Sequence, residues 1–105
     1  MAQFDVYRNP NPKSRSRIPY LLDVQSDLLE PLATRVLVPL CRPQVLGGKA
    51  AERLNPVFHV EGKKVVMLAP ELAGVAGGAV GDRVCSLAAE RSAIIAALDM
   101  VFTGI

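Results

Sequence analysis

The chain of 105 residues contains no tryptophan, three phenylalanines, two tyrosines, one histidine and two cysteines. With so few aromatic side chains, the core must be built mainly from aliphatic residues. Cys41 and Cys85 lie far apart and without paired spacing, which argues against a disulfide framework or a zinc site. We expect two small buried side chains in a protein of a reducing compartment.

Long apolar runs are also absent from the sequence. No run approaches the roughly 20 residues that a membrane-spanning helix needs. The N-terminal segment alternates apolar and polar residues and lacks the apolar centre of a signal peptide. We therefore expect a cytoplasmic protein that does not enter a membrane.

Apolar residues nevertheless make up 50% of the sequence, and the net charge is only +2. A chain of this length is expected to form one domain, residues 1–105, and such small domains often gain stability by association. The apolar content predicts that some apolar surface remains for a partner, most simply in a homodimer. The small net charge does not indicate nucleic acid by itself, and no direct nucleic-acid binding is expected.

Hydrophobic periodicity predicts a mainly β fold over the first two thirds of the chain. The strands are expected at residues 4–7, 20–24, 35–40, 56–60 and 63–68. Pro39 predicts an edge or a bulge in the third of them, because proline cannot donate a ladder hydrogen bond. The pair Glu61-Gly62 between the last two is the best hairpin signal in the sequence.

The period changes after residues 69–81, a segment rich in proline and glycine. Apolar residues then recur every three and four positions, which predicts one amphipathic helix from about Asp82 to about Phe102. Asp82 suits the N-terminal turn, where a negative charge meets the positive end of the helix dipole, and Gly104 suits the helix end. The expected architecture is a small, strongly bent antiparallel sheet or barrel with one C-terminal helix.

The residues give little indication of catalysis or metal binding. His59 lacks the partner motif of a catalytic triad, and we expect a structural role on the strand face that it shares with Val57. Asp23, Asp27 and Glu30 do not have the spacing of a calcium loop, and Asp27 is better interpreted as a turn cap. No catalytic residue, metal ligand or cofactor is predicted.

Two loop segments partly resemble binding motifs. Four glycines precede the predicted helix without matching a dinucleotide or phosphate loop, so a mobile loop is expected at Gly74, Gly77, Gly78 and Gly81. Basic residues also gather around a proline-containing loop near the N-terminus. That loop is either a solvated charged surface or a contact for RNA or an acidic protein segment.

The final six residues, Met100 to Ile105, are mostly apolar and have no polar tail behind them. Such an end is either buried in the protein's own core or kept for a partner. One interpretation is a helix stop at Gly104 in which Ile105 folds back on the last turn. Binding of a partner is the equal alternative.

Several short motifs occur in an order that resembles the CcdB toxin family. They are Gln3-Phe4-x-Val6-Tyr7, Leu22-Asp23-Val24-Gln25-Ser26-Asp27, Val38-Pro39-Leu40, Leu54-x-Pro56-Val57-x-His59 and Phe102-x-Gly104-Ile105. Each motif alone is weak, but their order and the coincident C-terminus are specific. The resemblance spans essentially the whole chain.

This resemblance implies a homodimeric cytoplasmic toxin with an SH3-like barrel and a C-terminal helix, the protein half of a plasmid-type toxin–antitoxin pair. Toxins of this family poison DNA gyrase: the dimer enters the gap between the A subunits and traps the enzyme on cleaved DNA. They are inhibitors without enzymatic activity, metal or cofactor. A disordered CcdA-like antitoxin neutralises them, and an acidic antitoxin tail is expected to land on basic loop residues.

The implied contacts can be placed residue by residue on this sequence. The gyrase contact comes from the helix end and from an apolar pair after the first acidic turn. Carried over, these positions are Asp99, Phe102, Thr103, Gly104 and Ile105, with Leu28 and Leu29 as the pair. The expected antitoxin contacts, Arg8, Lys13, Arg15 and Arg17, come from the local cluster of basic residues and not from matched family positions.

Two of these positions depart from the family pattern. The family has a tryptophan where this chain has Thr103, and an asparagine where it has Asp99. An aromatic anchor at an interface centre is typically worth ~2–4 kcal/mol, so Thr103 predicts gyrase binding weaker by roughly 30- to 1000-fold without compensation. Asp99 adds a negative charge whose effect depends on the partner's surface.

Two other functions stay open at the level of sequence. A related toxin class with the same fold is a ribosome-independent endoribonuclease that cuts messenger RNA. Here the basic loop is available for it, but a general acid and base are not evident. A retargeted family member that binds antitoxin but leaves gyrase alone is the other alternative.

Overall fold

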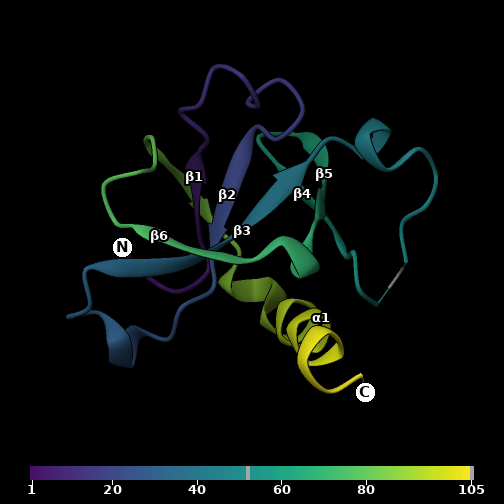
Figure 1. The fold of residues 1–105 in the computed structure, drawn as a ribbon. Coiled ribbons are helices and arrows are strands. Elements are labelled where there is room, and N and C mark those ends of the chain that lie inside the picture. The colour runs from purple at the N-terminus through teal and green to yellow at the C-terminus, as the bar shows by residue number, and fades with distance from the viewer. Residues whose placement is uncertain (52, 105) are drawn as a thin grey trace.

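In the described part of the chain, one curled antiparallel sheet carries most of the regular structure, and a single α-helix follows it toward the C-terminus (Figure 1). The computed structural model describes residues 1–51 and 53–104. The strands are β1 (Asp5–Arg8), β2 (Tyr20–Asp23), β3 (Thr34–Cys41), β4 (Val57–Val60), β5 (Lys63–Met67), β6 (Ala73–Ala76) and β7 (Arg83–Ser86). Short 3-10 turns are η1 (Asp27–Leu29), η2 (Pro43–Leu46), η3 (Ala69–Glu71) and η4 (Ala88–Glu90), and the helix is α1 (Arg91–Thr103).

The strands lie in the order β4-β5-β3-β2-β1-β7, and β6 also pairs with β3. All the pairings are antiparallel. The sheet bends into a half-barrel, which confirms the predicted mainly β fold with one C-terminal helix. None of the helices in the described ranges is both long enough and apolar enough to cross a membrane.

Strand β3 is an inner strand, so the prediction of an edge at Pro39 is wrong. On one side of β3, β6 pairs with it up to Leu37 and β5 takes over from Leu40. Pro39 lies between these two pairings, and its carbonyl oxygen accepts the N–H of Leu68 at 3.0 Å. Because the N and O of one strand residue face the same side, the missing donor falls in this gap and the ladder to β2 is intact.

The hairpin between β4 and β5 forms where turn chemistry predicts it. Glu61 and Gly62 both have positive φ, 54° and 74°. This is the backbone of a two-residue type I′ turn, whose twist matches that of the strands. Val60 consequently pairs with Lys63, and the register continues to Val57 and Val66.

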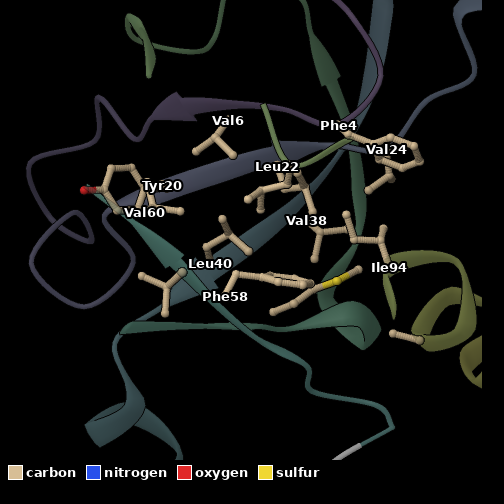
Figure 2. Close-up of a cluster of buried hydrophobic side chains, with 14 of the residues drawn as sticks. Phe4, Val6, Tyr20, Leu22, Val24, Val38, Leu40, Phe58, Val60 and Ile94 are labelled. Atoms are coloured by element: carbon tan, nitrogen blue, oxygen red, sulfur yellow. The ribbon is translucent and has the colours of Figure 1, made fainter. Parts of the chain in front are cut away.

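The core lies between the concave face of the sheet and α1. Its members are mainly aliphatic, with Phe4, Tyr20 and Phe58 as the aromatic contributions. Figure 2 shows these side chains gathered in one cluster, with Ile94 on the side of the cluster next to α1. Ile94 and Ala97 are the fully buried helix residues, which fixes the opposite face of α1 toward solvent.

The start of α1 is attached to the N-terminal strand region. Phe4 adopts a positive φ of 71°. Its carbonyl oxygen accepts the N–H of Leu87 at 2.8 Å, and its N–H donates to the Asp23 carbonyl. The Arg91 guanidinium lies over the Phe4 ring, 5.4 Å from the centroid, in a cation–π contact.

The predicted helix from Asp82 is wrong in its first half. Residues 83–86 form β7, which pairs with β1, and α1 begins only at Arg91. Asp82 therefore does not stabilise a helix N-terminus. The segment before it was also expected to be a mobile loop, yet Gly74 lies within β6 and pairs with Val36.

Candidate functional site

The last turn of α1 presents the helix-end residues predicted to bind a partner. Asp99, Phe102, Thr103 and Gly104 are all exposed, and the Phe102 side chain is 69% accessible to solvent. Figure 1 shows this end of α1 projecting away from the sheet. The predicted contact at Ile105 lies outside the described residues.

The backbone at this end is fixed by a helix stop. Gly104 has a φ of 74° and its N–H donates to the Met100 carbonyl oxygen at 3.1 Å. The Thr103 hydroxyl donates to the Asp99 carbonyl oxygen at 2.8 Å. The predicted stop at Gly104 is confirmed. The Gly104 N–H caps the Met100 carbonyl, and the Thr103 hydroxyl adds a side-chain hydrogen bond to the carbonyl four residues earlier.

The electrostatic character of this end is negative. Its last turn carries no basic residue, while Asp99 stands there on the exposed side. The carbonyl end of a helix has a partial negative charge, to which Asp99 adds. The helix end therefore combines one large apolar side chain with a negative field.

Leu28 and Leu29 lie on η1 and are exposed, by 90% and 48% respectively. The Ser26 hydroxyl caps this turn by accepting the N–H of Leu28 at 3.2 Å. Asp27, predicted as the turn cap, instead accepts the N–H of Gln3 at 2.8 Å and ties η1 to the N-terminus. η1 and the end of α1 lie well apart (Figure 1), so one chain does not bring the two parts of the predicted gyrase contact together.

Among the four basic residues predicted for antitoxin binding, Arg8 is already engaged. Its two guanidinium nitrogens donate to the two carboxylate oxygens of Glu61 at 3.0 and 2.7 Å. The Tyr20 hydroxyl donates to the same carboxylate at 2.6 Å. The hydrogen bonds from Arg8 and then Tyr20 lower the pKa of Glu61 to about 2. Arg8 thus fastens the β4–β5 hairpin to β1.

The other three basic residues, Lys13, Arg15 and Arg17, are exposed as predicted. Within the described ranges, none of them forms an ion pair. Their loop is nevertheless ordered, because Asn9 donates to the Ser14 hydroxyl at 3.0 Å and to the Ile18 carbonyl oxygen at 2.9 Å. This loop lies at the end of the molecule opposite the C-terminus of α1 (Figure 1).

The remaining candidates do not assemble a chemical centre. His59 is exposed on the face that it shares with Val57. Cys41 is buried and Cys85 half-buried, and neither forms a disulfide. The described residues contain no group of three His, Cys, Asp or Glu side chains placed to hold a metal ion.

Two polar clusters were not predicted from the sequence. One is the set of Arg8, Tyr20 and Glu61. The available signal was Glu61 itself, because glutamate is unusual at a turn position that requires positive φ. The other is the buried pair Asp23–Arg35, with 2.7 Å between Asp23 Oδ2 and Arg35 Nη2. The sequence placed Arg35 at the start of the third predicted strand, but nothing local indicated that Asp23 is its partner.

The fold and its exposed ends can be compared with known protein families. The model of the family described as CcdB protein matches residues 3–104 of the chain. The match includes all seven strands and α1. The chain therefore belongs to the CcdB protein family.

Proposed function

We propose that this protein is the cytoplasmic toxin of a type II toxin–antitoxin module and that it binds the A subunit of DNA gyrase, trapping the DNA-cleavage complex. Family membership supports the toxin role. The finer assignment rests on the exposed end of α1, above all on Phe102, 69% of which faces solvent. A large aromatic side chain held outside the core on a fixed helix end is typical of a partner anchor.

We infer further that the active form is a homodimer. A single chain leaves Leu28 and Leu29 apart from the end of α1, while a dimer presents two copies of each surface. Within the described residues, β6 pairs only with β3, and three of its four residues, Ala73, Gly74 and Ala76, are small and exposed. An edge strand of this kind suits close approach by a second chain. Light scattering of the purified protein tests this inference.

The antitoxin is expected to use the basic loop as one landing site. Lys13, Arg15 and Arg17 carry exposed charges without ion-pair partners in the described part of the chain. A disordered acidic segment would gain order and charge pairing there, with strong dependence on salt. Replacing Arg15 and Arg17 by glutamate should weaken antitoxin binding, and unchanged affinity at low salt would exclude this role.

The ribonuclease alternative gains no general base from Glu61, the carboxylate that is paired with Arg8. Glu61 is the acidic group that the structure places against Arg8, at the edge of the basic loop. Its pKa of about 2, set by the hydrogen bonds of Arg8 and Tyr20, makes it a poor proton acceptor near neutral pH. A general base works best when its pKa lies near the operating pH.

The decisive experiment incubates the purified protein with gyrase of the encoding organism, supercoiled plasmid and ATP. After detergent and protease treatment, we expect linear DNA that depends on both proteins. Phe102→Ala should lose most of this product, and Leu32→Ala, which truncates another exposed apolar side chain, serves as the matched control. A parallel incubation with messenger RNA should leave it intact. RNA cleavage, or no linear DNA at any toxin concentration, would reject the proposal.

A further inference from the structure

A pocket of about 390 Å³ opens between the basic loop and residues Gly81 and Asp82, which directly precede β7. Pro10 and Pro19 form apolar walls, and Arg15 and Asp82 contribute opposite charges. Arg8 and Gly81 complete the lining together with Asn9. The pocket therefore brings two predicted antitoxin contacts, Arg8 and Arg15, next to Asp82, which the sequence did not connect with them.

The walls of this pocket are held in place by hydrogen bonds. Gly81 donates its N–H to the Arg8 carbonyl oxygen at 2.9 Å, and Arg8 donates its N–H to the Asp82 carbonyl oxygen at 2.9 Å. The Arg8 side chain is fixed in turn by Glu61. The amide of Asn9 fixes the loop carrying the prolines. A ligand would meet a preformed surface and would lose little affinity to ordering it.

The two charged groups of the lining define what can enter. Arg15 and Asp82 form no ion pair with each other or with another described residue. Arg8, the second cation of the lining, is neutralised by Glu61. A ligand that satisfies the pocket must therefore bring an anionic group for Arg15 and a hydrogen-bond donor or cation for Asp82.

We propose that this pocket binds an acidic side chain of the antitoxin, with a basic residue of the same segment beside it. The proposal rests on the proposed toxin function and assigns the anchor within the basic loop to Arg15. A carboxylate matches the planar fork of a guanidinium. Nucleic acid fits less well, because Asp82 repels the row of phosphates that would follow the first one.

The proposal separates Arg15 from its neighbour Arg17. Both arginines are exposed on the same loop, but only Arg15 lines the pocket. A diffuse attraction would use either charge equally. A built site requires Arg15, and it also responds to Asp82, which lies 67 positions further along the chain.

The test uses the full-length protein labelled with nitrogen-15 and the peptide Ac-Glu-Gly-Lys-NH2 as the probe. Titration should shift the amide signals of Asn9 and Gly81, while Ac-Gln-Gly-Lys-NH2 should not. Hydrogen bonds to charged groups are worth about 1.5–3 kcal/mol, so Arg15→Gln should weaken binding about tenfold or more. Arg17 lies outside the pocket, so Arg17→Gln should change binding of this short peptide less than twofold, whatever Arg17 contributes to binding of the longer antitoxin. Asp82→Asn should weaken binding of Ac-Glu-Gly-Lys-NH2 but should not change binding of Ac-Glu-Gly-Gly-NH2, which lacks the lysine.

Three results would overturn the proposal. The first is the absence of shifts at Asn9 and Gly81, and the second is equal weakening by Arg15→Gln and Arg17→Gln. The third is tighter binding of hexauridylate than of the peptide, which would indicate an RNA surface instead. The gyrase assay with Arg15→Gln keeps the two proposals distinct. If Arg15→Gln loses peptide binding but still poisons gyrase, the results support both the pocket and the gyrase function. If the wild-type protein binds the peptide but does not poison gyrase, only the gyrase function is rejected.

Discussion

The hydroxyl of Thr103 is turned back onto its own helix, where it donates to the carbonyl oxygen of Asp99 at 2.8 Å. The side chain is therefore hydrogen-bonded within α1 and offers a partner little more than a methyl group. Among the described residues of this helix end, Phe102 is the large exposed apolar side chain. Relative to the tryptophan that the resemblance implies at this position, we expect Thr103 to reduce contact area without adding an unsatisfied polar group.

Thr103→Trp should strengthen binding to the gyrase A cleavage domain. The new ring would stand next to Phe102 on an exposed turn, where no described core residue has to move. By the usual worth of an aromatic anchor, the dissociation constant should fall by roughly 30- to 1000-fold. Calorimetric titration of the two proteins measures this change.

Thr103→Val is the matched control for that prediction. It keeps the shape of the side chain and removes the hydroxyl that donates to Asp99. Gyrase affinity should stay within about twofold of the wild-type value, because the hydroxyl faces the helix. If Thr103→Trp binds no better than Thr103→Val, the missing tryptophan does not limit binding.

Arg35→Met should destabilise the fold strongly at neutral pH. Arg35 donates from Nε to Asp23 at 2.9 Å, and both side chains are buried, at 4% and 0% exposure. Without its partner the buried carboxylate is uncompensated, which typically costs about 3–5 kcal/mol. Urea denaturation at pH 7 gives the free energy of unfolding that checks this value.

The pH dependence of the Arg35→Met variant provides a second readout. Burial already raises the pKa of Asp23, and Arg35 opposes that rise. In the variant, the folded-state pKa lies further above the unfolded one, so the folded state binds the proton more tightly. The penalty is present above the folded pKa and is relieved as the pH falls. The double variant with Asp23→Asn should recover stability at pH 7, and equal stability of the single and double variants would contradict this account.

Glu61→Gln should lower the free energy of unfolding, and the loss should be full only above about pH 4.5, where Glu61 is ionised in both the folded and the unfolded chain. Glu61 has a folded-state pKa of about 2 against an ordinary value of 4.5, because Arg8 and Tyr20 donate to it. A lowered carboxyl pKa stabilises the fold fully above about 4.5 and loses this effect as the pH falls toward about 2. The gap between the urea midpoints of wild type and variant should narrow over that window.

A mutant cycle identifies the source of this pH effect. In an Arg8→Gln background, the main hydrogen-bond donor to Glu61 is gone. Glu61→Gln should then change stability less, and with a weaker dependence on pH. An undiminished effect in that background would assign the stabilisation to Tyr20 or to the turn itself.

The sequence predicts those parts of the fold that local chemistry decides. The hairpin at Glu61-Gly62 follows from turn preferences, and the helix stop follows from the freedom of Gly104. The prediction of a helix at residues 82–90 was wrong because Val84 and Leu87 fit a helical period as well as an extended segment. Only pairing with β1, almost 80 residues away in the chain, selects the strand.

The same distinction applies to the functional surfaces. Exposure of Leu28 was expected from its place after a polar turn. Exposure of Phe102 was not, because the helical period included it in the apolar face and left open whether the end of the helix was buried. The loss of Arg8 from the basic surface was not predictable, since its partner Glu61 lies 53 residues further along the chain. The pocket that Arg15 shares with Asp82 is likewise a product of the tertiary fold.

Gly81→Ala should destabilise the protein, because the backbone of β1 lies against Gly81. A Cβ there would be 3.0 Å from the Arg8 carbonyl oxygen and 3.1 Å from the Arg8 Cβ. These atoms belong to a strand that is paired on both sides, so they yield little. Forced overpacking of this kind costs about 1–3 kcal/mol. The urea midpoint of the variant measures the loss.

Gly78→Ala is the matched control, three positions earlier in the same connection. A Cβ at Gly78 meets no atom within 4 Å, and its φ is not in the left-handed region. Reduced freedom of the unfolded chain should leave this variant neutral or stabilised by about 0.4–1 kcal/mol. Gly81→Ala should in addition weaken binding of Ac-Glu-Gly-Lys-NH2, since Gly81 lines the proposed peptide pocket. Equal stability of the two variants would mean that β1 shifts away from the new methyl group, and the preformed shape argued for the pocket would then be wrong.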